Sequence, residues 1–143
     1  MTMTALSLWQ PWASLIAVGV KTIETRTAPA PADLIGQRVA IHASTTRARD
    51  HVFTWLERSY PDAYRRVIHD GDRAALPCGA VLATARLRET RPSDFDDWDA
   101  TLSPVEGLWA WVLDELEVLP SPLPFAGESG LFEVPWPLQP RGL

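Results

Sequence analysis

The sequence predicts an α+β fold built on a small, curled, mixed β-sheet. Segments typical of strands recur along the whole chain, whereas segments typical of helices occur only near the start and in the middle. Strands and helices therefore do not alternate regularly, which argues against a doubly wound α/β fold. The length of 143 residues is usual for one domain, and we expect residues 1–143 to form a single domain.

The chain is expected to begin with a strand followed by a short helix. Residues 5–8 form the strand, and Pro11 suits the first turn of a helix over residues 11–18, where its missing N–H is not needed. Gly19 supplies the left-handed residue that commonly ends a helix.

A second strand is predicted over residues 22–27, which are rich in β-branched side chains. The period of two places Glu24 and Arg26 on the same face of this strand. Two prolines among alanines then predict a loop over residues 28–31.

The middle of the chain predicts a strand and then a helix. Residues 37–43 alternate so that Val39 and Ile41 point to one side and His42 to the other. The hydroxyl residues 44–46 are good N-caps, so we expect the strand to end before them and a helix to follow. Pro61 is expected to break that helix.

Three further segments read as strands, over residues 79–89, 107–113 and 130–134. Acidic or proline-rich turns separate them. Together with the earlier strands they complete the mixed sheet.

The charge is unevenly distributed between the two parts of the chain. The net charge of −5 argues against a protein that coats nucleic acid nonspecifically, which requires many basic side chains. Residues 1–88 carry eleven basic and seven acidic side chains (+4), and residues 89–143 carry two basic and eleven acidic ones (−9). The first part suits an anionic ligand, and the acidic C-terminal half suits a basic protein partner.

Several classes of site are not expected. There is no secretion signal and no apolar run near the roughly 18 residues that cross a bilayer, so we expect a cytoplasmic protein without a membrane partner. Cys78 is the only cysteine and the histidines are scattered, so no disulfide, metal site or other cofactor is expected.

Lys21 is the only lysine, beside twelve arginines. A lysine ammonium loses its proton when it is desolvated or lies near another cation such as Arg26, and the free amine acts as a base or nucleophile. The alternative is a solvated lysine in a turn. Likewise, Glu24 and Arg26 form either a surface ion pair or the lining of a pocket.

Other candidate ligand contacts lie near a helix start and on one strand. Trp9, Gln10, Pro11 and Trp12 surround the start of the first helix, where free N–H groups attract anions. Trp9 either stacks on a base or packs against the protein, and Trp12 fits the core. His42 and Ser44 are further candidates, although a buried histidine is often satisfied by the backbone.

The chain resembles the ASCH domain family in three early motifs, which are Leu6-Ser7-Leu8, Gln10-Pro11-Trp12-Ala13 and Gly19-x-Lys21-x-x-Glu24-x-Arg26. It is similar to later parts of the same pattern at His42-Ala43-Ser44, Gly79-Ala80-Val81-Leu82, Trp111-Val112-Leu113 and Gly130-Leu131-Phe132. The resemblance implies a PUA-like curled β-barrel with helices packed at its openings. It also implies a cleft beside the Lys21 to Arg26 strand that binds RNA or a nucleoside.

Two branches of that family differ in the residues of the cleft. One bacterial branch hydrolyses 4-acetylcytidine with a Lys, a Thr three residues later and a Glu on a later strand. Lys21 matches this set, but Glu24 stands in the Thr position and Ala83 near the Glu position. Glu24 resembles instead a branch that includes a eukaryotic transcription coactivator and small bacterial proteins, some of them ribonucleases and others binders. The aromatic residue that often follows the Arg in that branch is replaced by Thr27 and Ala28.

Three functions are consistent with these observations. The first is an RNA- or nucleoside-binding module that uses Lys21, Glu24 and Arg26. The second is a hydrolase acting on RNA or on a modified nucleoside, with Lys21 and Glu24 as catalytic residues. The third is a protein-interaction module that uses the acidic C-terminal half.

Overall fold

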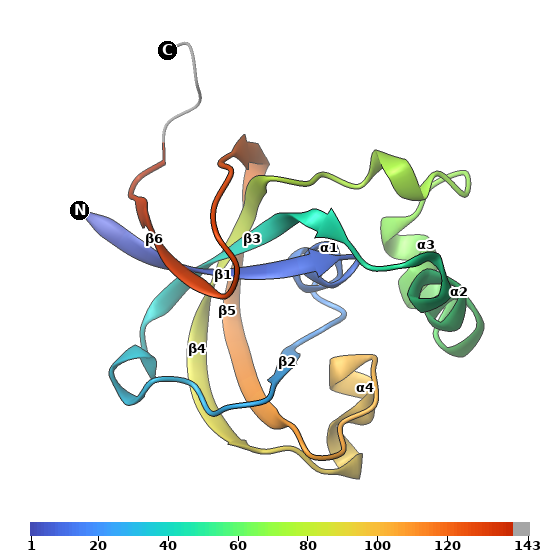
Figure 1. The fold of residues 1–143 in the computed structure, drawn as a ribbon, viewed down its shortest axis with the longest axis horizontal. Coiled ribbons are helices and arrows are strands. Elements are labelled where there is room, and N and C mark those ends of the chain that lie inside the picture. The colour runs from blue at the N-terminus through green and yellow to red at the C-terminus, as the bar shows by residue number, and fades with distance from the viewer. Residues whose placement is uncertain (139–143) are drawn as a thin grey trace.

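The computed structural model describes residues 1–138 and contains one six-stranded mixed sheet with helices gathered mainly at one end (Figure 1). The strands are β1 (Thr2–Gln10), β2 (Ile23–Arg26), β3 (Arg38–Arg47), β4 (Ala80–Pro92), β5 (Trp109–Pro124) and β6 (Leu131–Pro135). The helices are α1 (Trp12–Ala17), α2 (Asp50–Ser59), α3 (Pro61–Val67) and α4 (Trp98–Thr101), with 3-10 turns at Ala32–Leu34, Arg73–Ala75 and Phe95–Asp97.

The sheet confirms the α+β prediction and its mixed strand directions. The strand order is β2-β5-β4-β3-β1-β6, in which β1 and β3 are parallel and every other pair is antiparallel. The sheet is strongly curled (Figure 1), but within residues 1–138 no hydrogen-bonded ladder joins its edge strands β2 and β6. The barrel that the family resemblance implies is therefore open along this side.

Side chains from both faces of the sheet form separate cores. On one face, α1 packs against residues of β1, β3, β4 and β5, including Leu6, Val39, Ile41, Leu87 and Leu113. On the other face, Ala5, Ala40, Val81 and Val134 form a smaller cluster with Phe125 and Phe132. As predicted, His42 lies opposite Val39 and Ile41, because neighbouring residues of a strand point to opposite faces.

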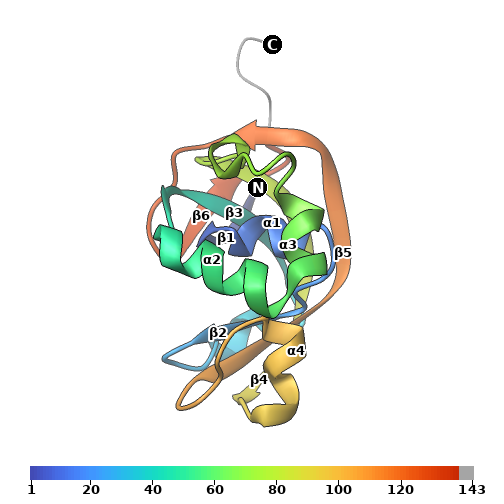
Figure 2. The ribbon, with the colours of Figure 1, turned by 90° about the vertical axis from the view of Figure 1, so that its right-hand side faces the viewer.

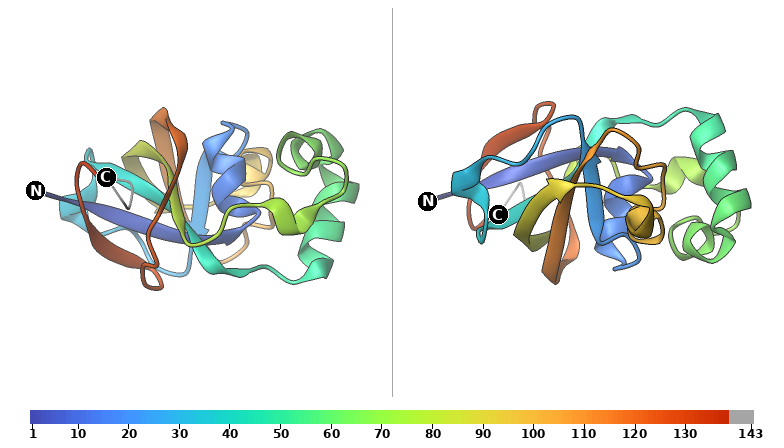
Figure 3. Two further views of the ribbon diagram at one scale, coloured as in Figure 1. Left: turned by 90° about the horizontal axis from the view of Figure 1, so that it is seen from above. Right: turned by 90° about the horizontal axis from the view of Figure 1, so that it is seen from below.

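Helices α2 and α3 lie beyond α1 at one end of the long axis, opposite the N-terminus (Figures 2 and 3). Leu15 of α1, Leu56 of α2 and Tyr64 of α3 share one buried cluster. No helix among residues 1–138 is long and apolar enough to cross a membrane.

Two sequence predictions about local structure were wrong. Residues 44–46 do not cap a helix, because β3 continues to Arg47 and α2 begins without a side-chain cap. The pairing of Arg47 with Gln10, and its hydrogen bonds to three carbonyls near residue 75, hold this segment extended. The predicted break at Pro61 is confirmed, since α2 ends at Ser59 and α3 begins at Pro61, where a missing N–H is tolerated.

Strand β5 is the second difference, since it continues to Pro124 instead of ending near residue 113. Only the first four residues of β5 pair with β2, so the later part has a free edge. Proline lacks a backbone N–H and is tolerated on such an edge, which is why this proline-rich segment lies in a strand and not in the turn that the sequence predicted.

Candidate functional site

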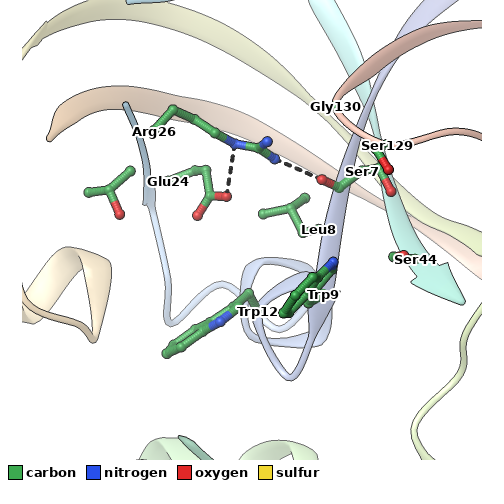
Figure 4. A pocket seen from close by; sticks show the side chains of 10 residues that line it. Ser7, Leu8, Trp9, Trp12, Glu24, Arg26, Ser44, Ser129 and Gly130 are labelled. Atoms are coloured by element: carbon green, nitrogen blue, oxygen red, sulfur yellow. Dashed lines mark hydrogen bonds and ion pairs between the residues drawn. The ribbon is translucent and has the colours of Figure 1, made fainter. Parts of the chain in front are cut away.

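A cavity of about 390 Å³ lies on the side where the sheet is open. It is lined by Ser7, Leu8 and Trp9 of β1, Trp12 of α1, Glu24, Thr25 and Arg26 of β2, Ser44 of β3, and Ser129 and Gly130 before β6. Figure 4 shows Glu24 and Arg26 extending from β2 toward the β1 side of this cavity. The cavity therefore brings together chain segments that are far apart in the sequence.

Glu24 lies between two cations. Its Oε1 atom is 3.5 Å from Nζ of Lys21, and its Oε2 atom is 3.3 Å from Nε of Arg26. The predicted shared face of Glu24 and Arg26 is confirmed, and the pair lines the cavity instead of lying on the open surface. A carboxylate in this position accepts hydrogen bonds only, so it selects N–H or O–H groups.

Lys21 is buried, with only 2% of its surface exposed. Its ammonium donates a 2.7 Å hydrogen bond to the carbonyl of Thr101 and lies 5.1 Å from the ring centre of Trp12. Burial lowers the pKa of Lys21 from its ordinary value, and the neighbouring Glu24 partly opposes that shift. Lys21 does not line this cavity but belongs to the lining of a second one of about 280 Å³, and its link to the first cavity is the contact with Glu24.

The guanidinium group of Arg26 connects the two sides of the cavity. Its Nη2 atom donates a 2.7 Å hydrogen bond to the backbone oxygen of Ser7, and the group lies 5.9 Å from the ring centre of Trp111. Its Nε atom is buried and makes no hydrogen bond of good geometry, although Glu24 is close. A buried donor without a hydrogen bond of good geometry is uncommon in folded proteins.

Two tryptophans differ in their surroundings. Trp9 is 53% exposed and lines the cavity, so one of its faces is available for stacking. Trp12 also lines the cavity, but it packs against both the α1 core and the α2–α3 core and holds the Lys21 ammonium. The sequence left open whether Trp9 stacks on a base or packs against the protein, and its exposure favours stacking.

Gln10 and Pro11 do not line the cavity. The Gln10 side chain is fully buried, accepts from the backbone N–H of Ser14, and donates to the Ser14 hydroxyl and the Pro77 carbonyl. Pro11 is buried at the start of α1. Both residues shape the turn between β1 and α1, and we leave them out of the proposed ligand set.

His42 is also outside the cavity lining and is 1% exposed. Its Nδ1 atom is 3.1 Å from the Ser7 hydroxyl, and its Nε2 atom is 2.7 Å from the carbonyl oxygen of Phe125. Burial lowers the pKa of His42, so the neutral ring is favoured near pH 7. The backbone satisfies one ring nitrogen, as in the alternative that the sequence left open, and the Ser7 side chain contacts the other. Ser44 lines the cavity.

Sequence reasoning did not propose Ser7, Leu8, Thr25, Ser129 or Gly130 as site residues, although the structure places them in the cavity lining. Ser7 and Gly130 lie in motifs that carried the family resemblance, which is the signal that was available. Among residues 1–138, no group of histidine, cysteine or acidic side chains has the arrangement of a metal site.

Comparison with known proteins agrees with this architecture. A scan against protein-family models matches the ASCH domain over residues 6–120, and a search of the curated proteins found no match. The crystal structure of ASCH from Zymomonas mobilis is similar, with a TM-score of 0.58 and 19% sequence identity over 94% of this chain and 88% of that chain.

Crystal structures of two mutant forms of the Zymomonas mobilis protein are similar as well. One is 21% identical over 94% of this chain and 89% of that chain, and the other is 20% identical over 94% and 91%. Both have a TM-score of 0.56. Because the family match covers most of the sequence and the fold agrees, the chain belongs to the ASCH domain family.

Proposed function

We propose that this protein binds RNA or a nucleoside in the cavity around Glu24 and Arg26. The observation that carries the proposal is the position of Glu24, held between Lys21 and Arg26 at a cavity that also exposes Trp9. Family membership supports it, because ASCH domains are in general RNA-binding. The lone Cys78 is consistent with the reducing cytoplasm as the place of action.

Each side chain in this cavity has a distinct task in the proposed complex. Glu24 accepts from an exocyclic amine or a ribose hydroxyl, because a carboxylate has no proton to donate. Arg26 donates to a phosphate or to a base edge, and Trp9 stacks on the base. The predicted contribution of Lys21 is indirect, since its ammonium holds Glu24 and Trp12 in place.

Hydrolysis of RNA or of an acylated nucleoside such as 4-acetylcytidine is the second candidate function. The observation in its favour is the buried Lys21 amine, whose lowered pKa eases loss of the proton 3.5 Å from Glu24. In this scheme Glu24 carries a proton between Lys21 and the substrate, because only Glu24 of the two lines the cavity.

A protein-interaction role for the acidic C-terminal half has less support. Arg86 pairs with Asp114 and with Glu115, and Arg38 lies near Glu115 and Glu117. Part of the negative charge is therefore neutralised within the fold. We keep this role as an outcome that binding experiments will test.

Trp fluorescence provides a test of the proposal. The purified protein is titrated with cytidine, 4-acetylcytidine and a short single-stranded RNA, and quenching is followed in the wild type, Trp9→Leu and Arg26→Ala. Loss of a stacked base costs about 1–3 kcal/mol, so Trp9→Leu should weaken binding by about 5- to 150-fold. Arg58→Ala, which changes an exposed arginine of α2 outside the cavity lining, is the matched control.

The same samples separate binding from catalysis. Release of acetate from 4-acetylcytidine, or cleavage of the RNA, that disappears in Glu24→Gln would favour the hydrolase. Binding without turnover would favour the binding module. Equal affinity in the wild type, Trp9→Leu and Arg26→Ala would contradict the proposed cavity.

A further inference from the structure

The hydrogen bonds around His42 determine which way the Ser7 hydroxyl proton points. A carbonyl oxygen only accepts hydrogen bonds, so the 2.7 Å contact between Nε2 of His42 and the oxygen of Phe125 requires the proton to be on Nε2. In the neutral ring the other nitrogen, Nδ1, then carries a lone pair. The 3.1 Å contact between Nδ1 and the Ser7 hydroxyl is therefore donated by Ser7.

The surroundings of His42 hold this arrangement in place. The imidazole is buried and meets the ring of Phe132 edge-on at 5.1 Å. Gly127 lies so close that an added Cβ would be 2.7 Å from Cε1 of His42. The Phe132 ring and the backbone at Gly127 thus pack against the imidazole whose two nitrogens contact Ser7 and Phe125.

Ser7 is at the same time part of the cavity lining. The next two residues of β1, Leu8 and Trp9, line the same cavity (Figure 4). The Ser7 hydroxyl already donates its proton to Nδ1 of His42. Its oxygen can therefore only accept a hydrogen bond from a ligand.

Ser44 provides a contrast within the same cavity. Its hydroxyl oxygen accepts a 3.1 Å hydrogen bond from the backbone N–H of Thr46, which leaves its own proton free to be donated. The two serines thus differ in hydrogen-bond direction: toward a ligand, Ser7 accepts and Ser44 donates.

We propose that Ser7 is a specificity-determining residue that accepts a hydrogen bond from an N–H or O–H group of the ligand, and that His42 is the positioning residue that keeps it an acceptor. The inference rests on the proposed function and adds a chemical class of ligand to it. Ser7 and Glu24 together make the cavity rich in acceptors, so it favours a nucleoside with free amino and hydroxyl donors over one whose donors are methylated.

The protonation state of His42 is tested first, without a ligand. Long-range ¹H–¹⁵N NMR spectra at pH 7.5 should show a protonated Nε2 and an unprotonated Nδ1 in the ring of His42. A protonated Nδ1 would overturn the inference while leaving the proposed function intact, because Ser7 would then be free to donate.

Ligand specificity is tested with cytidine and guanosine, each compared with its N,N-dimethylamino form and its 2′-O-methyl form. Wild-type protein should prefer the unmethylated compounds. Ser7→Ala should reduce at least one of these preferences by about 2- to 10-fold, as expected for one lost hydrogen bond. Ser59→Ala, which changes an exposed serine of α2 outside the cavity lining, is the matched control and should leave both preferences unchanged.

The outcomes separate the inference from the function on which it rests. Binding of cytidine or guanosine to Ser7→Ala with unchanged preferences would overturn the role of Ser7 and leave the binding function standing. Failure of the wild type to bind any of the six compounds or a short RNA would contradict the proposed function, and the inference with it. Melting curves of both variants show whether each one is folded.

Discussion

The Nη2 atom of Arg26 on β2 donates a 2.7 Å hydrogen bond to the backbone oxygen of Ser7 on β1. These two strands do not pair in the sheet, because the ladder is open between β2 and β6 and β1 lies next to β6. One side chain thus joins the two sides of the opening at which the cavity lies. The same guanidinium group contacts Glu24, so the open edge of the sheet and the proposed ligand site share one residue.

Arg26→Lys tests this double role. Lysine is a point donor without the planar fork of arginine, so it cannot contact Glu24 and the Ser7 carbonyl in the same way. We expect the free energy of unfolding to fall by about 1–2 kcal/mol, the range for a lost hydrogen bond from a charged group that is partly exposed. Urea unfolding measures this change, and Arg58→Lys on the exposed side of α2 should stay within about 0.5 kcal/mol of wild type.

Lys21→Met removes the buried charge and keeps a long apolar stem. The Thr101 carbonyl loses its donor and Glu24 keeps only Arg26 as a cation, so we expect a loss of about 1–3 kcal/mol in unfolding free energy. Thermal and urea unfolding measure the loss. An unchanged stability would show that the Lys21 contacts contribute nothing net to folding.

His42 should make the free energy of unfolding increase with pH. Its pKa in the folded protein is below that of the unfolded chain, so the unfolded state binds more protons as pH falls through and below about 6.5. Unfolding free energy should therefore rise with pH in that window, by at most about 1.4 kcal/mol per pH unit for one proton. The groups packed on the ring are the Ser7 hydroxyl, the Phe125 carbonyl and the Phe132 ring, and none of them titrates there.

Urea midpoints between pH 5 and 8 measure this slope. His42→Asn should flatten it, whereas the exposed His51→Asn should leave it as in the wild type. A slope that persists unchanged in His42→Asn would assign the effect to other groups.

Gly127→Ala should be strongly destabilising. Gly127 has a left-handed φ of +71°, and an added Cβ would lie 2.6 Å from Cζ of Phe132 as well as against His42. Left-handed strain costs about 1–2 kcal/mol, and the overlap adds about 1–3 kcal/mol for overpacking. Gly36→Ala is the control, since φ there is +86° but the space around it is open. Equal losses in the two variants by thermal unfolding would show that the close approach to His42 and Phe132 is relaxed at little cost.

Much of the local structure followed from the sequence. The positions of all six strands and of the first helix were predicted, although the ends of β3 and β5 were not. The end of β3 was missed because hydroxyl residues that favour an N-cap lie inside the strand, which continues to Arg47 and pairs there with Gln10. Local preference was weaker there than a contact with a distant part of the chain.

The candidate site was predicted only in part. The strand period correctly placed Glu24 and Arg26 together, and the aromatic residues near the first helix included Trp9 and Trp12. Gln10 was also predicted to contact a ligand, but its hydrogen bonds to Ser14 and to the Pro77 carbonyl direct its side chain into the protein. The direction of that side chain depends on a carbonyl 67 residues away, which no local pattern contains.

The sequence by itself determined that this chain forms an α+β fold with the pattern of the ASCH family, and that Glu24 and Arg26 share a strand face, because side-chain direction alternates with every residue of a strand. Only the tertiary structure decided that Lys21 is buried against Thr101, 80 residues further on, and that Ser129 and Gly130 complete the cavity beside Ser7. Burial and hydrogen-bond direction depend on which distant segments pack together. Those two quantities distinguish a surface lysine from a buried one, and an accepting serine from a donating one.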